Sequence, residues 1–414
     1  MSQIFDFTAA GPILKQRYES KPVERGFFAD RPFLADVPKN ETLGGSAFQV
    51  AIKYAPMSTR APTVPGALAN GSPDQYAAFN VTNIYNDFAV VQLSGAAIDQ
   101  TQGDENAMIK LLTEAFDGAY DTAYESQSRQ LWGNGGGSRG QIPASGQTLS
   151  SATLTLTNVG DAVNFWGGQV IQAAPDDGST PTTVRAGTLT VKGVDYQAGT
   201  VTFTVGLSVG ISAIAASDFL FMSGDYGAGY VGLGGWNPAT APGSTLFFGV
   251  DRTKNIVGLS GWRVNGYGAG YEDTLTEMVA RMCSIGALKG KKRCYMNPID
   301  WAQFAKTQNS KVIYDRGSVA SVSTPEVMFE ALKMMTPKGP MDIVADVHCP
   351  QGVGRVIGID NVELLSNGKI CRPSNNWANL MWLPSYLDDI YQTRLVSRSF
   401  LQCRAPYELG VATF

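Results

Sequence analysis

Few residues in this chain are suited to chemistry, and only one of them is a histidine. That histidine, His348, lies close to Asp346 and next to Cys349 in the segment DVHC. An imidazole, a carboxylate and a thiol together could bind a metal or activate a nucleophile. In an extended strand, however, side chains 346 and 348 point to one face and side chain 349 to the other. We therefore expect neither a metal site nor a catalytic group here.

A glycine-rich stretch is the second candidate for chemistry. Gly227, Gly229 and Gly232 match the pattern GxGxxG, and Asp251 follows at about the spacing of a ribose-binding acid. A dinucleotide site also needs a helix directly after the glycines and a surrounding βαβ unit. The sequence Leu-Gly-Gly-Trp-Asn-Pro follows instead, and we expect it not to open a helix. The stretch predicts a glycine-rich loop without a cofactor.

The remaining reactive residues form no recognisable site. The carboxylate pairs Asp176–Asp177 and Asp388–Asp389 are typical of solvent-exposed turns. The chain contains no P-loop, HExxH or GxSxG sequence. An odd number of dispersed cysteines predicts free thiols: Cys283, Cys294, Cys349, Cys371 and Cys403. The residues thus predict no enzyme activity, no metal and no cofactor.

Composition limits the classes of function further. The 414 residues are 44% hydrophobic but only 16% charged, and 46 of them are glycine. Globular proteins usually carry about a quarter charged residues, so this chain hides surface, most simply against copies of itself. The net charge of −4 and the scattered Lys and Arg argue against sequence-specific nucleic-acid binding. No signal peptide or membrane-spanning run is evident, so we expect an intracellular protein without a membrane partner.

The element that must organise these parts is a long helix predicted over Asp104–Trp132. Asp104 and Glu105 suit its start, Arg129 suits its last turn, and Gly133 ends it. At ~1.5 Å per residue such a helix is a rod of ~43 Å. Its apolar residues recur every four positions, so the apolar stripe winds around the helix and contacts several neighbours.

Before this helix we expect an arm and a long hairpin. Residues 1–42 carry several proline and phenylalanine residues, with a short helix near residues 13–20. Alternating residues then predict strands over Ser46–Ala55 and roughly Ala77–Leu93. The tip between the strands is long and rich in Pro, Gly and Ala. Because a two-stranded hairpin is marginal alone, we expect it to lie on another subunit.

A change of composition after the helix marks a separate module at residues 150–226. This segment is rich in Thr, Val, Gly and Asp and predicts a small β-barrel or sandwich inserted into the chain. Its expected strands are Thr153–Thr157, Gln169–Ala173, Leu189–Val194, Thr200–Val205 and Phe219–Met222.

Mixed helix and strand patterns return after the module. Residues 227–271 predict loops and irregular strand. An amphipathic helix is expected over Glu272–Leu288, a strand over Arg293–Met296, and a helix capped by Asn297 and Pro298. Val327–Met335 is compatible with a helix or with a hairpin, and Ile390–Phe414 alternates as long strands.

Taken in this order, the parts resemble a tailed-bacteriophage major capsid protein of the Hong Kong 97-type fold. The resemblance rests on the arm ILKQRYESKPVERGFFADRPFLADVPKNETLGGSAFQVAIKYAP, the run GLGGWNP, FFGVDRT and GLSGW, the segment CYMNPIDWAQFAK, and the segment GPMDIVADVHCPQGVGRVIGIDNVELL. It covers nearly all of the chain outside residues 150–226.

This resemblance implies an α+β chain with a defined order of parts. These are an N-terminal arm (1–42), an extended β-hairpin loop (43–95), a peripheral domain with the spine helix 104–132 (96–149), the inserted β-barrel-like module (150–226), a linker (227–271), an axial domain (272–385), and peripheral closing strands (386–414).

The resemblance also implies a function and partners. The chain would be a major head protein that self-assembles from pentamers and hexamers into an icosahedral virion shell enclosing double-stranded DNA. Assembly would occur in the host bacterial cytoplasm, with a separate scaffolding protein, a portal and, in some members, a decoration protein, and the packaged DNA would be contacted non-specifically. An encapsulin-like bacterial nanocompartment is the alternative within this fold. A β-rich hydrolase or carbohydrate-binding protein is a third interpretation.

Site residues follow from the resemblance alone. Some family members crosslink a loop lysine to an asparagine of a neighbour, and Lys53 is the sole lysine between residues 40 and 109. An ordinary surface lysine is nevertheless the stronger expectation there. The candidate contacts between subunits are Phe27, Phe28, Phe33, Phe48, Tyr54 and Arg60.

Overall fold

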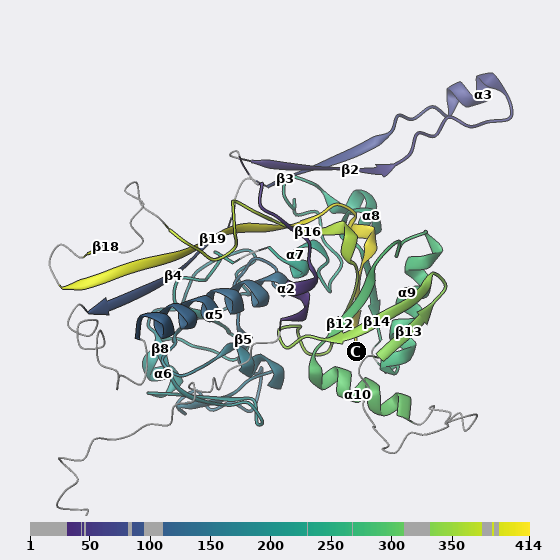
Figure 1. Ribbon diagram of the computed structural model, residues 1–414. Helices are drawn as coiled ribbons and strands as arrows, with labels where there is room; N and C mark the ends of the chain where they lie inside the picture. Colours follow the sequence, from purple (N-terminus) through teal and green to yellow (C-terminus); the bar gives the residue numbers. More distant parts are fainter. Residues whose placement is uncertain are drawn as a thin grey trace, which may run out of the picture.

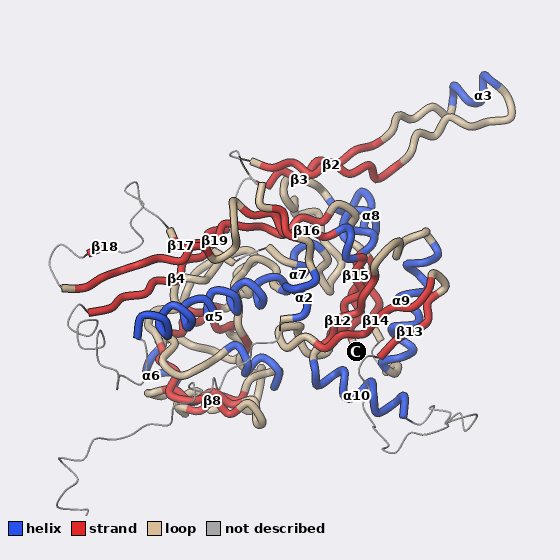
Figure 2. The backbone as a smooth tube through the Cα atoms, in the orientation of Figure 1, coloured by secondary structure: helices blue, strands red, loops and turns tan. Residues whose placement is uncertain are grey.

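The computed structural model describes residues 31–42, 44, 47–81, 85–94, 111–229, 231–266, 268–309, 332–374, 383–384 and 389–414. Within these ranges it contains three six-stranded sheets and a separate two-stranded hairpin. The hairpin projects from the body that the three sheets form (Figure 1; Figure 2). The short helix expected near residues 13–20 lies outside the described residues.

The first sheet is built on a long strand near the C-terminus, β19 (Ile390–Cys403). Its neighbours are β16 (Val362–Ser366), β4 (Tyr85–Ser94), β17 (Arg372–Pro373), β18 (Leu383–Pro384) and, beyond β16, β1 (Lys39–Asn40). Lys39 pairs in parallel with Leu364, so the end of the N-terminal arm is a strand of this sheet. The arm is therefore attached to its own chain at this point.

The long helix α5 (Leu111–Trp132) runs along one face of this sheet (Figure 1). Ser399 of β19 donates a hydrogen bond to Gln127 of the helix, with 3.0 Å between Oγ and Oε1. Gln127 in turn donates to the carboxylate of Asp87 on β4 at 3.3 Å. The predicted helix is confirmed from Leu111 to its end at Trp132. Residues 104–110 lie outside the described part of the chain.

The hairpin differs from its prediction in the second strand. β2 (Phe48–Ala55) pairs with β3 (Gln75–Val81), as expected. The expected continuation to Leu93 is wrong, because residues 85–94 form the separate strand β4. All ten residues of β4 pair with β19. Because β4 pairs with β19, it lies in the sheet that α5 covers, and α5 buries one face of the strand. An isolated hairpin would not bury this face.

The second sheet belongs to residues 140–222 and contains all five predicted strands. They are β6 (Thr153–Thr155), β7 (Val170–Ala174), β8 (Leu189–Asp195), β9 (Thr200–Phe203) and β10 (Phe219–Met222), joined by β5 (Gly140–Gln141). The sheet order is β5-β10-β7-β8-β9-β6. Thr157, just after β6, donates its N–H to the carbonyl of Gln141 in β5 at 3.0 Å. The two ends of the sheet therefore meet, as in a small barrel.

This barrel-like sheet, which we call the β-module, has a hydrophobic core of its own. Leu154, Phe165, Ile171 and Val201 are completely buried within it. These residues do not share a cluster with the core of the rest of the chain. The β-module can therefore bury its apolar side chains without help from the other two sheets.

The third sheet has the order β11-β20-β15-β12-β14-β13. Its strands are β11 (Trp262–Asn265), β12 (Lys292–Met296), β13 (Leu332–Thr336), β14 (Gly339–Ala345), β15 (Val353–Gly358) and β20 (Leu409–Thr413). Residues 332–335 were compatible with a helix or a hairpin, and they form a strand of the β13–β14 hairpin. Residues 327–331 lie outside the described chain. β20 differs from expectation, because it pairs with β11 and β15 and not with the sheet of β19.

Two predicted helices cover this third sheet. α9 (Tyr271–Ser284) buries Leu275, Met278, Val279 and Met282, which confirms the predicted apolar face. It ends four residues before the predicted Leu288, because Gly286 and Leu288 adopt left-handed backbone angles, φ +84° and +62°. α10 (Pro298–Asn309) begins as predicted, and Asn297 accepts a hydrogen bond from the N–H of Ile299 at 3.0 Å.

The segment between the β-module and α9 contains short helical turns. These are α7 (Leu233–Trp236), a 3-10 turn at Arg252–Asn255 and α8 (Ile256–Ser260). The expectation that no helix opens after Gly232 is therefore wrong by a single turn. Asn237 and Pro238 end that turn, and Trp236 inserts into the main core, where it is fully buried.

Candidate functional site

The hairpin of β2 and β3 is the most exposed feature of the fold, and its base is firmly fixed to the body. Val50, Ile52 and Val81 are buried on its inner face, and Phe79 is completely buried. The ring of Phe79 packs edge-on against Trp236, with centroids 5.2 Å apart. These contacts belong to the main hydrophobic core, so the direction of the hairpin is set by the body of the chain.

Backbone hydrogen bonds add to this anchoring. The N–H of Asn80 donates to the carbonyl of Phe248 at 2.9 Å. On the other strand, the side chain of Asn255 donates to the carbonyl of Tyr54 at 2.9 Å. Both strands of the hairpin are therefore attached to the segment 248–255, and only the part beyond them projects.

The hairpin tip, residues 56–74, has a defined structure although the sequence predicts none. Ser58 and Ser72 exchange two backbone hydrogen bonds of 3.2 Å. Beyond them lies the short helix α3 (Val64–Ala69), whose first turn is capped by the hydroxyl of Thr63. In Figure 1, α3 is at the far end of the hairpin, well away from the three sheets.

The tip carries apolar side chains that none of the described residues covers. Val64 and Leu68 of α3 are 74% and 78% exposed, and Met57 is 55% exposed. Tyr76, at the start of β3, is 64% exposed. Monomeric soluble proteins rarely collect large apolar side chains on a projection in this way. The tip therefore has the character of a contact surface for another molecule.

Lys53 lies at the root of this tip and is held in an ion pair. Its Nζ is 2.7 Å from Oδ2 of Asp74. Asp74 also accepts the N–H of Met57 at 2.6 Å and the hydroxyl of Tyr76 at 3.3 Å. The hydrogen bond to Asp74 raises the pKa of Lys53. A protonated amine is a poor nucleophile, and the crosslink at Lys53 stays a prediction.

The other predicted contact residues fall into three groups. Phe33 is completely buried, with its ring centroid 4.6 Å from that of Trp132, so it leaves no surface for a neighbour. Phe48 and Tyr54 are half-buried and Arg60 is exposed, so these three remain candidates. Phe27 and Phe28 lie outside the described residues.

Asp346 and His348 have a structural role in this fold. The expected strand is wrong at this position, since β14 ends at Ala345 and a turn follows. One carboxylate oxygen of Asp346 accepts the N–H of Phe33 at 3.2 Å, and the other accepts the N–H of His348 at 2.9 Å. Burial lowers the pKa of His348 to about 3, so its imidazole is neutral. Across the described ranges, no group of three or more potential ligands could hold a metal.

The glycines of the GxGxxG pattern serve close packing. A Cβ on Gly232 would lie 2.1 Å from the carbonyl oxygen of Leu131 in α5, and one on Gly229 would lie 2.6 Å from the nitrogen of Gly137. The stretch therefore passes directly against the end of the long helix and its following loop.

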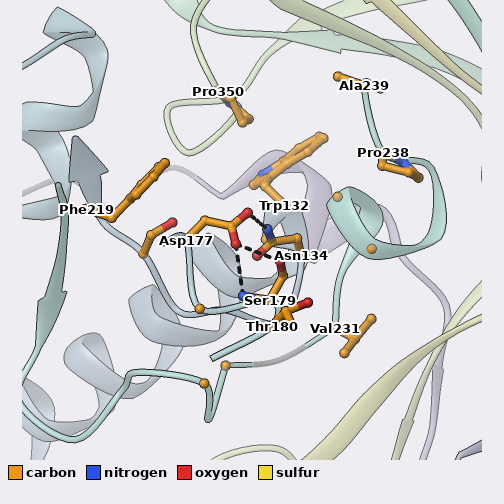
Figure 3. Close-up of a pocket in the computed structure, with 18 of the residues that line it drawn as sticks. Trp132, Asn134, Asp177, Ser179, Thr180, Phe219, Val231, Pro238, Ala239 and Pro350 are labelled. Carbon is orange, nitrogen blue, oxygen red and sulfur yellow. Dashed lines mark hydrogen bonds between the residues drawn. The ribbon is translucent and has the colours of Figure 1, made fainter. Parts of the chain in front are cut away.

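A cleft of about 1100 Å³ lies where the β-module meets the rest of the chain. Figure 3 shows Asp177, Ser179 and Thr180 of the β-module close to Asn134, with Trp132, the last residue of α5, nearby. The carboxylate of Asp177 accepts a hydrogen bond from the Asn134 side chain at 2.6 Å. Asp176 and Asp177 accept the N–H groups of Gly178 and Ser179, as predicted for turn residues, and Asp177 also contacts the loop after α5.

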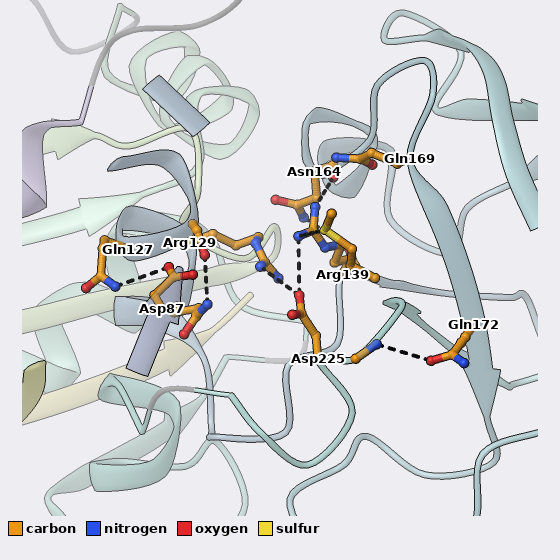
Figure 4. Close-up of polar contacts among 12 residues, drawn as sticks. Asp87, Gln127, Arg129, Arg139, Asn164, Gln169, Gln172 and Asp225 are labelled. Atoms are coloured by element: carbon orange, nitrogen blue, oxygen red, sulfur yellow. Dashed lines mark hydrogen bonds and ion pairs between the residues drawn. The ribbon is translucent and has the colours of Figure 1, made fainter. Parts of the chain in front are cut away.

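Charged residues fix the same junction. The carboxylate of Asp225 lies 3.6 Å from Arg129 on α5 and 3.3 Å from Arg139 on the β-module side (Figure 4). Both arginines are more than nine-tenths buried. Burial lowers the pKa of Arg139 to about 10. Nothing in the spacing of these three residues along the sequence indicates this cluster.

The described helices include none that is both long and apolar enough to span a membrane.

Comparison with known proteins gives matches among solved structures alone. No protein-family model and no curated protein sequence matches the chain. A chain of the cyanophage A-1(L) capsid asymmetric unit is 12% identical, with a TM-score of 0.61, and the match covers 97% of both chains. A chain in the capsid of a native GTA particle is 11% identical, with a TM-score of 0.52 and coverage of 100% and 99%. The holo-SrpI encapsulin complex from Synechococcus elongatus PCC 7942 matches with 10% identity, coverage of 100% and 96%, and a TM-score of 0.47. The first two matches show that this chain has a capsid-protein fold over nearly its whole length.

Proposed function

We propose that this chain is the major capsid protein of a tailed bacteriophage and self-assembles into an icosahedral shell around double-stranded DNA. The observation that carries the proposal is the hairpin: a firmly anchored base and an apolar tip, in a chain with a capsid-protein fold. Its role is structural, and no residue is assigned to catalysis. The shell would assemble in the host cytoplasm and become part of the virion.

The finer layout that we propose is that of the Hong Kong 97-type fold. The sheet of β4, β16 and β19 with α5 would form the peripheral domain. The sheet of β11–β15 and β20 with α9 and α10 would form the axial domain. The β-module would be an insertion between them. Because β20 pairs with β11 and β15, it would belong to the axial domain in this layout. Because β16, β17 and β18 pair with β19, they would belong to the peripheral domain.

Assembly would proceed by burial of the hairpin tip on a neighbouring copy. The tip and the surface that receives it are different parts of the chain, so the contact is heterologous and closes into rings of five and six. Each large apolar side chain that becomes fully covered contributes roughly 1.5–3 kcal/mol before the cost of association. Met57, Val64, Leu68 and Tyr76 are the side chains available for this. A separate scaffolding protein, a portal and a decoration protein would complete the set of partners.

The test is assembly of the purified chain with and without the tip. Because Ser58 and Ser72 already pair, residues 59–71 can be replaced by an Asn-Gly turn without moving the strands. We expect wild-type chains to form closed shells in negative-stain images and in light scattering. The shortened chain is expected to unfold at the same temperature but to form no shells. A wild-type chain that stays monomeric with added scaffolding protein, or a shortened chain that assembles normally, would contradict the proposal.

A further inference from the structure

The cleft beside the β-module is lined by four arginines that are almost completely buried. Arg129, Arg139, Arg252 and Arg355 are 8%, 6%, 8% and 5% exposed. Folded proteins nearly always pair a buried charge with an opposite charge. The carboxylates around this cleft therefore show which of the four arginines have their charge neutralised.

The four arginines divide into two pairs with different surroundings. Arg129 and Arg139 share the carboxylate of Asp225, as Figure 4 shows. Within the described ranges, no carboxylate lies within 4.0 Å of the guanidinium nitrogens of Arg252 or Arg355. The second pair is thus a buried positive charge that no carboxylate of the described residues neutralises.

Arg252 and Arg355 converge on the short helix α7 and its last residues. Nη1 of Arg355 donates to the carbonyls of Asn237 at 2.9 Å and Leu233 at 3.3 Å. Nη1 of Arg252 donates to the carbonyl of Gly235 at 2.8 Å. The guanidinium group of Arg252 also lies over the ring of Phe247, 4.1 Å from its centroid.

These contacts use only part of each guanidinium group. The Nε atoms of Arg252 and Arg355 are buried and have no hydrogen-bond acceptor. An arginine presents five N–H donors in a planar fork, and here the carbonyls occupy only the Nη1 end. The carbonyls position the two side chains but supply no full negative charge.

The carboxylates that line the cleft do not neutralise Arg252 or Arg355. Asp177 accepts hydrogen bonds from Asn134, in the loop after α5, and from the hydroxyl of Ser179 in the β-module. Asp161 is buried and accepts a hydrogen bond from the Asn158 side chain at 3.3 Å, and burial raises its pKa to about 6. Burial lowers the pKa of Arg252 and Arg355 to about 10, so both remain cationic at neutral pH.

We propose that Arg252 and Arg355 bind a phosphate-class oxyanion in this cleft. Arginine forks match the geometry of phosphate oxygens and bind them with charge-assisted hydrogen bonds. The neutral imidazole of His348, whose Nδ1 lacks a hydrogen-bond partner, also lines the cleft. The phosphate is either free inorganic phosphate or a phosphodiester of nucleic acid. This inference concerns binding by a single chain and does not depend on shell formation.

The test is titration of the full-length, unassembled chain with inorganic phosphate in a calorimeter at constant ionic strength, with chloride as the balancing ion. We expect saturable binding of one phosphate, and at least a tenfold weaker affinity in Arg252→Gln. Arg252→Lys keeps the charge but loses the fork, and should lie between the two. The matched control is Arg281→Gln, an exposed arginine on α9, which should bind like wild type. Arg252→Gln must retain the wild-type circular dichroism spectrum, and Arg252→Lys decides the result if it does not.

A second arm of the experiment identifies the source of the phosphate. A short single-stranded DNA is added to the phosphate-saturated chain. Displacement of the bound phosphate identifies a phosphodiester as a ligand of the site, and retention identifies free phosphate. Absence of saturable phosphate binding to the wild-type chain, or equal affinity in wild type and both Arg252 variants, would overturn the inference.

Discussion

The ammonium group of Lys53 and the carboxylate of Asp74 face each other across the hairpin, 2.7 Å apart, where the regular pairing of β2 and β3 ends. Asp74 also holds the N–H of Met57, the second residue of the tip. The pair therefore connects the anchored strands to the projecting tip. We expect its removal to loosen the tip and to leave the body unchanged.

Asp74→Asn tests this expectation. Lys53 is exposed and Asp74 is partly exposed, so the temperature of global unfolding should stay the same, whereas limited proteolysis within residues 56–74 should become faster. The pKa of Asp74 is lowered by Lys53, so the contact is present above the ordinary pKa of an aspartate and is lost as the pH falls through the lowered value. Glu277→Gln removes a comparable exposed pair on α9 and should not change cleavage of the tip. Equal cleavage in wild type and Asp74→Asn would refute the role of this pair.

Leu68→Asp tests the contact surface of the tip. Leu68 is 78% exposed, so the substitution should change the free energy of unfolding by less than about 0.5 kcal/mol. Shell formation should be lost, because the aspartate would have to be buried without a partner in the contact. Val209→Asp in the β-module changes an equally exposed apolar residue, 76% exposed, and serves as the control. Negative-stain images and sedimentation of the three proteins measure the outcome. Normal shells from Leu68→Asp would exclude the tip helix from the contact.

Much of the fold is predictable because local patterns and burial agree there. The apolar face of α9, including Met278 and Met282, recurs with helical spacing, and all five strands of the β-module alternate with clear turns between them. Errors arise where pairing depends on residues distant in sequence. Residues 85–94 have the pattern of a strand, but nothing near them in sequence identifies β19, about 300 residues later, as the partner. The same reason explains why β20 was expected in the wrong sheet.

The candidate sites were less predictable than the fold. The exposure of the hairpin tip follows from its composition and from the marginal stability of an isolated hairpin. The arginines at the cleft come from four separate elements, and no spacing in the sequence connects Arg252 with Arg355. Phe33 was expected to contact a neighbouring subunit but is buried in its own chain. The arm around it has no periodic apolar pattern, so no local signal in the sequence predicts this burial.

Phe33→Ala tests whether the arm is anchored in its own chain. The ring is completely buried and packs against Trp132 and Tyr295, with centroids at 4.6 and 5.1 Å. Removing it should lower the free energy of unfolding by about 3–5 kcal/mol, as for other fully buried phenylalanines. Urea denaturation followed by tryptophan fluorescence measures the change. The half-buried Phe48, replaced in the same way, should give a clearly smaller loss. Similar values for the two variants would contradict the anchoring of Phe33.

Asp225→Asn tests the junction between the β-module and α5. The substitution removes the negative charge between Arg129 and Arg139, both of which remain buried. We expect a loss of about 1.5–3 kcal/mol, the usual value for hydrogen bonds to charged groups. Hydrogen exchange should become faster at the contact between residues 129–139 and the β-module, while α9 exchanges as before. Glu363→Gln, which breaks the exposed pair with Arg404, is the control and should leave that contact unchanged. Uniformly faster exchange throughout the chain would show that Asp225 supports the whole fold and not this junction.

Glu125 should make the stability of the chain depend on pH near neutrality. Burial is the main cause that raises its pKa from 4.5 to about 7, against the opposing effect of Arg139, Arg129 and Arg31. Between those two pH values the folded chain holds a proton on Glu125 that the unfolded chain has released. Stability therefore falls as the pH rises through this window, by up to about 3 kcal/mol for a shift of this size.

Glu125→Gln isolates this effect from other titrating groups. The amide resembles the protonated carboxyl group, so the variant should match wild type near pH 4.5 and be more stable than wild type at pH 8. Thermal unfolding measured at intervals from pH 4.5 to 8 gives both curves under the same conditions. The contribution of Asp161, whose pKa is also raised, is common to both proteins and cancels in the difference. A difference between the curves that stays constant across this range would show that Glu125 does not titrate in it. A wild-type advantage at pH 8 would mean that the ionised carboxylate is stabilised by its arginine neighbours, because their attraction would then exceed the cost of its burial.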